Sequence, residues 1–209
     1  KPKTSGGYTI PEGNLFTNPK NGRPEIYAMG VRNPFRMTVD DASGTLYFGD
    51  VGPNVLPQLN IKPLGYDEIN VAPKAGNFGW PLFIGPNEPY PIFDFDNNKT
   101  VRTYDPKAPE NPSPNNTGIK RLPPALPPLI WYGNTESKQF PSLGVGGRSI
   151  MAGPVYHFDR YRHSPPIVGS SCVIHPVADI MLSLSRCSPL SFSAQFHMLM
   201  THRMSDGFT

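Results

Sequence analysis

One segment near the N-terminus carries side chains that could bind a flat, anionic ligand. Arg32-Asn33-Pro34 puts a guanidinium and an amide at a predicted strand-to-turn junction, because the residue before a proline is kept out of the α region. A planar guanidinium suits a carboxylate or a quinone oxygen, and the adjacent amide adds a donor and an acceptor. In the alternative interpretation, Arg32 pairs with an acidic residue such as Asp50 and only joins two strands.

Two further segments offer oxygen atoms to a cation. In Gly52-Pro53 the proline has a carbonyl but no N–H, and the glycine lets the backbone approach closely. Two successive carbonyl oxygens suit a hard cation such as Ca²⁺, although a Gly-Pro pair is more often an ordinary turn. Asp67 and Glu68 are neighbours on a predicted strand, so their carboxylates point to opposite faces. We expect one of them to face solvent and the other to bind calcium or an opposite charge.

Short strands with turns between them are expected to position these segments. The clearest pair covers residues 35–39 and 45–49, joined by Asp40-Asp41-Ala42-Ser43-Gly44. Asp and Ser hydrogen-bond to the local backbone and Gly accepts a positive φ, so this linker predicts a hairpin. Further strands are predicted at residues 25–29, 68–71, 129–132 and 153–158. The pattern predicts an all-β fold, as in propellers, sandwiches and barrels.

The composition agrees with this fold, because 27 prolines and 20 glycines among 209 residues leave little room for helices. Residues 85–128 are proline-rich and lack periodicity, which predicts a long surface loop. From about residue 163 acids become rare and Ser, Met, His and Cys become common. In this tail residues 180–184 fit a helix or a strand, and Cys172 and Cys187 fit a disulfide or free thiols.

The charge of the chain does not indicate a polyanionic partner. The net charge is +3, from 19 basic and 16 acidic residues, and the basic residues are scattered. We therefore expect no nucleic-acid partner.

The sequence also bears on membrane spans and export. No apolar stretch reaches the roughly 18 residues of a membrane span, so no membrane span is expected. The chain begins Lys1-Pro2-Lys3-Thr4 without a signal peptide, so any export signal is expected upstream or is absent.

Four segments, taken together and in chain order, resemble the glucose/sorbosone dehydrogenase family of quinoprotein sugar dehydrogenases, which use pyrroloquinoline quinone (PQQ). They are Tyr27-Ala28-Met29-Gly30-Val31-Arg32-Asn33-Pro34, Gly52-Pro53-Asn54, Asp67-Glu68-Ile69-Asn70 and Gly76-Asn77-Phe78-Gly79-Trp80-Pro81. Later segments such as Gly146-Gly147-Arg148 extend the likeness over roughly residues 8–160. The segment at residues 76–81 is also expected to have a structural role, because its aromatic side chains lie between turn glycines.

The resemblance implies that residues 1–162 form part of a six-bladed β-propeller and that residues 163–209 are an unrecognised tail, disordered or read out of frame. Such a propeller holds PQQ over Ca²⁺ and oxidises a sugar hydroxyl, with a histidine as base and the quinone as hydride acceptor. By this resemblance Arg32 and Asn33 contact the quinone. The carbonyls of Gly52 and Pro53 bind the cofactor calcium, and Asp67 and Glu68 bind further calcium.

The resemblance also implies a sugar substrate, an electron acceptor and a periplasmic or extracellular location. The family's catalytic histidine lies upstream of Lys1, so the chain is expected to contain no catalytic residue and to be inactive alone. Its own histidines come too late to match: His157, His163, His175, His197 and His202. The alternative function is a non-catalytic binding module resembling hedgehog-interacting proteins. Part of a propeller has unpaired strand edges, so this fragment is expected to aggregate.

Overall fold

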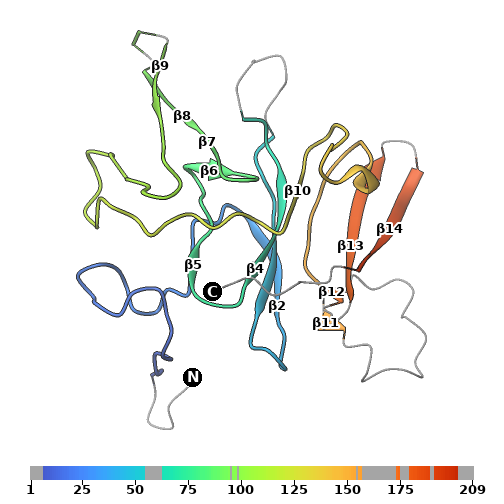
Figure 1. The fold of residues 1–209 in the computed structure, drawn as a ribbon, viewed down its shortest axis with the longest axis horizontal. Coiled ribbons are helices and arrows are strands. Elements are labelled where there is room, and N and C mark those ends of the chain that lie inside the picture. The colour runs from blue at the N-terminus through green and yellow to red at the C-terminus, as the bar shows by residue number, and fades with distance from the viewer. Residues whose placement is uncertain are drawn as a thin grey trace. The chain divides into compact units, whose positions relative to one another are not determined.

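The computed structural model has an all-β fold, as the sequence predicts (Figure 1). It describes residues 7–54, 63–94, 96–97, 99–153, 155–156, 173–174, 179–188 and 191–201. In these ranges the regular elements are β-strands and one turn of 3-10 helix, η2 (Pro141–Leu143). Within them we find no helix with the length and apolar character needed to cross a membrane. The sheets are open rather than closed into barrels, as expected for part of a propeller.

The chain divides into two compact units, each of which is described by itself. The first consists of Lys1–Arg32, Asn54–Gly65 and Ala72–Pro128, and the second of Asn33–Pro53, Tyr66–Val71 and Leu129–Thr209. The division passes between Arg32 and Asn33. The predicted hairpin, the Gly52-Pro53 pair and the two acidic residues all belong to the second unit.

A four-stranded sheet is the main element of the second unit. Its strands are β2 (Pro34–Val39), β3 (Leu46–Asp50), β4 (Asp67–Ala72) and β10 (Ile130–Tyr132), in the order β10-β4-β3-β2. β2 pairs antiparallel with β3, and β10 pairs antiparallel with β4. Four strands is the size of one propeller blade. The strands predicted at 35–39, 45–49, 68–71 and 129–132 are confirmed.

The β2–β3 hairpin closes through the turn chemistry that its sequence predicts. The Oδ1 of Asp40 accepts a hydrogen bond from the backbone N–H of Ala42 at 3.1 Å, and its Oδ2 accepts one from the Ser43 hydroxyl at 2.6 Å. Gly44 has φ 71°, in the left-handed region that glycine adopts without strain. Because Asp40 is buried, these bonds satisfy a carboxylate that would otherwise be costly to desolvate.

A β-bulge interrupts β2 immediately after the Arg-Asn-Pro segment. Pro34 pairs with Asp50 and Met37 pairs with Phe48, so Phe35 and Arg36 together lie opposite a single residue of β3. Arg36 adopts φ 63° at this point. A bulge of this kind bends the strand and changes the direction of its side chains. The alternation of the sequence alone predicts an uninterrupted strand.

The core of the second unit lies against this sheet. The buried residues that pack together there come from β3, β4, β10, η2 and the segment that follows η2: Tyr47, Ile69, Ile130, Tyr132, Leu143 and Ile150. Ile150 approaches β3 closely, because a Cβ placed on Gly49 would lie 3.0 Å from its Cγ1. The segment around residue 150 is therefore fixed beside the end of β3.

Short strand pairs and well-bonded loops make up the first unit. β1 (Ala28–Met29) pairs parallel with β5 (Gly76–Asn77), so the strand predicted at 25–29 is shorter than expected. Gly30, at φ 71°, follows β1 at a point where a Cβ would contact the side-chain oxygen of Asn77. Phe78 is buried in the same region, in agreement with a structural role for residues 76–81.

The long surface loop predicted at residues 85–128 is wrong for residues 88–103, which contain strands. β6 (Phe83–Ile84) pairs with β7 (Glu88–Pro89), and β8 (Pro91–Asp94) pairs with β9 (Lys99–Thr103). Every residue of β9 is exposed, and its sequence carries no alternation of apolar and polar residues that would predict a buried face. Residues 104–128 contain no strand, and backbone hydrogen bonds such as Leu126 N–H to the Asn77 carbonyl hold them in place.

The last part of the chain also forms strands. β11 (Val155–Tyr156) pairs parallel with β12 (Val173–Ile174), and β13 (Asp179–Ser188) forms an antiparallel hairpin with β14 (Ser191–Thr201). Of the two alternatives for residues 180–184, the strand is the one observed. Cys172 lies outside the described residues, and so do all the histidines except His197 on β14. The state of the cysteines stays a prediction.

Candidate functional site

Arg32 and Asn33, the predicted quinone contacts, are both exposed. In the first unit the Arg32 guanidinium carbon lies 5.6 Å from the centre of the Trp80 ring, within the range of a cation–π contact. In the second unit the backbone N–H of Asn33 donates to Oδ1 of the buried Asp50 at 2.6 Å. The carbonyl of Asn33 accepts from Val51 N–H at 3.1 Å. The backbone of Asn33 is therefore fixed, while its side chain is accessible.

A buried charged group lies beside the predicted cation ligands in the second unit. The guanidinium of Arg148 donates from Nη1 to Oδ1 of Asp67, from Nη2 to the Pro53 carbonyl at 2.5 Å, and from Nε to Oδ1 of Asn134 at 2.7 Å. The side chain of Arg148 is 4% exposed and that of Asp67 is fully buried. We call Arg148 with Pro53, Asp67 and Asn134 the Arg148 cluster.

Gly52 allows the loop after β3 to reach this cluster. Its backbone N–H donates to Oδ1 of Asp67 at 3.1 Å. A Cβ at this position would collide with the carbonyl oxygen of Tyr66 and would lie 2.6 Å from the carbonyl carbon. No side chain therefore fits between residue 52 and the start of β4, so the glycine is needed for the close backbone approach.

The electrostatics of Asp67 are set mainly by its burial. Loss of hydration raises the pKa of its carboxyl, and the charge of Arg148 together with the Gly52 N–H opposes that rise. Because the folded-state pKa lies above the unfolded value, this group contributes less stability as the pH rises through its pKa. Arg148 therefore reduces the cost of a carboxylate that is deeply buried.

The expectation that one of the two acidic residues faces solvent is wrong. Asp67 is 0% and Glu68 is 6% exposed. β4 lies between β10 and β3 in the sheet, and nearly every residue along it is buried, so both of its faces are covered. Oε2 of Glu68 accepts a long hydrogen bond of 3.4 Å from Nδ2 of Asn70.

Two of the four predicted calcium ligands, Pro53 and Asp67, do not fit a metal ion as they are arranged. The Pro53 carbonyl and Oδ1 of Asp67 both accept hydrogen bonds from Arg148, so a positive charge already lies against them. Calcium takes about six to eight oxygen ligands. Among the residues that the structure describes, no group of three or more His, Cys, Asp or Glu side chains could hold a metal. We therefore derive no step through calcium.

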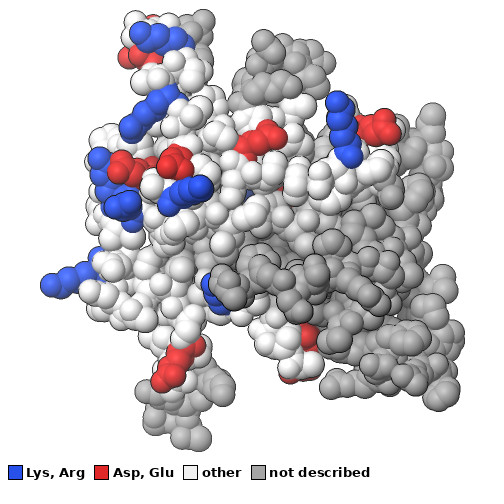
Figure 2. All heavy atoms as spheres, viewed as in Figure 1, with Lys and Arg blue, Asp and Glu red and all other residues white. Residues whose placement is uncertain are grey.

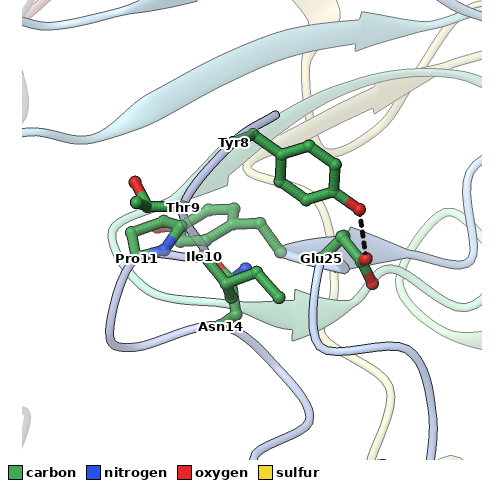
Figure 3. Close-up of a pocket in the computed structure, with 7 residues that line it drawn as sticks. Tyr8, Thr9, Ile10, Pro11, Asn14 and Glu25 are labelled. Carbon is green, nitrogen blue, oxygen red and sulfur yellow. Dashed lines mark hydrogen bonds between the residues drawn. The ribbon is translucent and has the colours of Figure 1, made fainter. Parts of the chain in front are cut away.

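A separate pocket of about 360 Å³ lies within the N-terminal segment of the first unit (Figure 3). Its lining residues are Tyr8, Thr9, Ile10, Pro11, Asn14, Glu25 and Tyr27. The Tyr8 hydroxyl donates to Oε1 of Glu25 at 2.6 Å. This bond raises the pKa of Tyr8 and lowers the pKa of Glu25. Of these residues Glu25 and Tyr27 belong to the strand predicted at residues 25–29, and the sequence assigns a ligand to none of them.

Basic and acidic side chains are mixed on one face of the molecule. On the face shown in Figure 2, the described basic and acidic side chains are interspersed and do not gather into one patch of a single sign. This distribution agrees with the scattered charges of the sequence. The expectation of no nucleic-acid partner stays a prediction.

Comparison with known proteins places the chain in a family. The model of the Glucose / Sorbosone dehydrogenase family matches residues 4–113, just over half of the chain. The chain therefore belongs to the glucose/sorbosone dehydrogenase family. The matched range contains all six predicted site residues, from Arg32 to Glu68, whereas Arg148 lies beyond it.

Individual relatives include both a plant protein and a bacterial enzyme. The HIPL1 protein of Arabidopsis thaliana is 32% identical over 132 residues, which is 63% of this chain and 15% of that protein. HIPL2 from the same plant is 33% identical over 94 residues, 44% of this chain and 12% of that protein. The aldose sugar dehydrogenase YliI of Escherichia coli K12 is 37% identical over 73 residues, 35% of this chain and 17% of that enzyme. The chain thus spans less than a fifth of each, and no solved structure matches it.

Sequence reasoning gave no role to Arg148 or Asn134. Arg148 was noted only as part of the Gly-Gly-Arg segment, with no partner assigned. It meets Asp67 across 81 positions of the chain. The sequence indicates a basic partner only indirectly, because an acidic pair on a central strand requires an opposite charge if the pair is buried.

Proposed function

We propose that this chain is part of a sugar dehydrogenase-type oxidoreductase that oxidises a sugar hydroxyl, with PQQ as the hydride acceptor. The observation that carries the proposal is the family match over residues 4–113. The likeness to the aldose sugar dehydrogenase YliI supports it. An aldose is the proposed substrate. The proposed location is periplasmic or extracellular, and a separate electron acceptor would reoxidise the quinone.

In this proposal Arg32 and Asn33 bind the cofactor. When bound, PQQ supplies the electrophilic ring that takes the hydride. Arg32 is exposed and lies over Trp80, and a guanidinium matches the anionic groups of the quinone in charge and hydrogen-bond geometry. The Asn33 side chain adds an amide, and the bond from its backbone N–H to Asp50 fixes its position. No residue of the chain is assigned as the general base.

A non-catalytic binding module is the second candidate function. HIPL1 and HIPL2 match 63% and 44% of the chain, more than the 35% matched by the aldose sugar dehydrogenase. The Arg148 cluster also favours this candidate, because the Pro53 carbonyl, expected to hold the cofactor calcium, and Asp67, expected to hold further calcium, are both bonded to an arginine. The partner in this case would be another protein, as the likeness to hedgehog-interacting proteins implies.

Quinone binding by the 209-residue chain distinguishes the two candidates. The chain is titrated with PQQ, and binding is monitored through the quenching of tryptophan fluorescence. Arg32→Ala is expected to weaken the affinity by about tenfold or more, because it removes a charge-assisted hydrogen bond. The matched control is Arg102→Ala, which removes an exposed arginine of β9 and is expected to leave the affinity unchanged.

The same preparations test the proposal in two further ways. Arg32→Ala is expected to keep the wild-type unfolding midpoint, because the side chain is exposed. Equal losses of affinity and stability would indicate that Arg32 only joins parts of the fold. Absence of PQQ binding by the wild-type chain would favour the binding module. Aldose-dependent dye reduction by this chain is not expected, and turnover would contradict the prediction that it contains no catalytic base.

A further inference from the structure

We propose that the guanidinium of Arg148 is a built-in replacement for a calcium ion, which fixes the Gly52-Pro53 loop to β4 without any metal. The proposal goes beyond the oxidoreductase function and does not depend on it, because every group involved belongs to the described chain. It applies to the second unit alone, which contains all members of the Arg148 cluster.

The three acceptors of Arg148 are oxygens of the types that calcium binds, although they are fewer than the full coordination of that ion. They are a backbone carbonyl from Pro53, a carboxylate oxygen from Asp67 and a side-chain amide oxygen from Asn134. Backbone carbonyls, carboxylates and amide carbonyls are typical ligands of Ca²⁺ in proteins. Here they converge on the guanidinium from three separate segments of the chain.

The fork of the arginine matches this arrangement. Nε, Nη1 and Nη2 each donate to a different acceptor, so all three nitrogens of the guanidinium are used. A planar group with donors in fixed directions can make these three bonds together, whereas the ammonium of a lysine is a single point of charge. The side chain of Arg148 is 4% exposed, so its bonds to Asp67 and Pro53 are partly shielded from water, whereas its bond to Asn134 is exposed.

Charge balance favours one guanidinium over an added metal ion. In the cluster a single positive charge lies against the single carboxylate of Asp67, and the other two acceptors are neutral. A divalent ion at the same oxygens would lie beside a buried positive charge, and like charges repel strongly where water is excluded. The second carboxylate oxygen of Asp67, Oδ2, is buried and has no hydrogen-bond donor among the residues that the structure describes. Removing the guanidinium would therefore leave a buried anion without a cation.

Calcium titration of the wild-type chain and of Arg148→Ala tests the proposal. Calcium chloride is added to each folded protein, binding is measured by calorimetry, and the unfolding midpoint is recorded with and without the metal. We expect wild type to show no calcium binding that depends on Asp67. We expect Arg148→Ala to bind calcium about tenfold or more tightly than wild type, since the competing charge is gone.

Two controls assign any binding to the cluster. The double variant Arg148→Ala/Asp67→Asn is expected to lose the calcium binding that Arg148→Ala gains. Arg102→Ala, which removes an exposed arginine, is expected to gain none. Methylguanidinium is a second probe, and it is expected to raise the unfolding midpoint of Arg148→Ala but not that of wild type.

Several results would overturn the proposal. One is calcium binding by wild type that Asp67→Asn abolishes, because the metal and the guanidinium would then be bound together. Another is a folded Arg148→Ala variant that gains no calcium affinity. Should Arg148→Ala not fold even with calcium, the wild-type measurement decides: no Asp67-dependent binding supports the proposal, and such binding refutes it.

Discussion

The buried pair between Arg148 and Asp67 gives the sharpest prediction for stability. Replacing Arg148 with alanine leaves a carboxylate that is 0% exposed without its charged partner, and it also removes the donors to Pro53 and Asn134. Loss of one member of a buried ion pair costs about 3–5 kcal/mol. We therefore expect Arg148→Ala to lower the free energy of unfolding by about that amount, a large fraction of the total stability of an ordinary domain.

A double-mutant cycle measured by urea denaturation checks this value. Asp67→Asn is expected to destabilise the chain too, because Arg148 then lacks its counter-charge. The double variant Arg148→Ala/Asp67→Asn is expected to be more stable than the sum of the single effects indicates, by about 1–3 kcal/mol. The matched control is the exposed ion pair of Lys120 and Glu110, in which Nζ of the lysine lies 3.6 Å from Oε2 of the glutamate. Lys120→Ala is expected to cost no more than about 1 kcal/mol.

The pH dependence of the same variants makes the test stricter. Burial raises the pKa of Asp67, so its folded form holds a proton at pH values where the unfolded form has lost it. The contribution of this group to stability therefore falls as the pH rises through its pKa and is constant above it. The cost of Arg148→Ala is expected to be largest at neutral pH and to shrink in acid. A cost that is small at neutral pH, or that does not change with pH, would refute the electrostatic reasoning.

Two further predictions concern other buried positions. Burial, with a smaller effect of Asp40, raises the pKa of Tyr47 to about 12, so we expect a loss on the order of 3 kcal/mol as the pH rises from about 10 to about 12. Denaturation at alkaline pH should show a smaller decline for Tyr47→Phe. Gly52→Ala is expected to cost at least about 1–3 kcal/mol, because its Cβ would collide with the Tyr66 carbonyl. Gly118→Ala, where the nearest atom would be 3.5 Å away, should cost much less in the same urea assay.

Local chemistry explains why the hairpin was predictable from the sequence. The bonds of Asp40 to Ala42 and Ser43 span two and three positions, so their donors and acceptors can be read together along the chain. The strand at residues 129–132 was predictable for a similar reason, because its apolar and aromatic residues face a core. Strand β9 is exposed along its whole length and has no such face, so its sequence resembles that of a loop.

The candidate site was predictable only in part, because its decisive contact is long-range. Gly52, Pro53 and Asp67 could be selected as residues suited to a charged site, and the structure brings Pro53 and Asp67 together through Arg148. The identity of the positive charge could not be predicted, since Arg148 lies 81 positions from Asp67. The burial of Glu68 likewise depends on the neighbours of β4 in the sheet. Whether Arg32 and Asn33 contact a quinone stays a prediction.

The position of β2 in its sheet has a practical consequence for handling the chain. β2 is the last strand in the order of its sheet, and Phe35, Met37 and Val39 along it are 48%, 60% and 55% exposed. An outermost strand with apolar side chains is a template onto which a second molecule can add its own strand. Dilute preparations, or a lysine in place of Met37 or Val39, should therefore favour single molecules over assemblies that grow by strand addition.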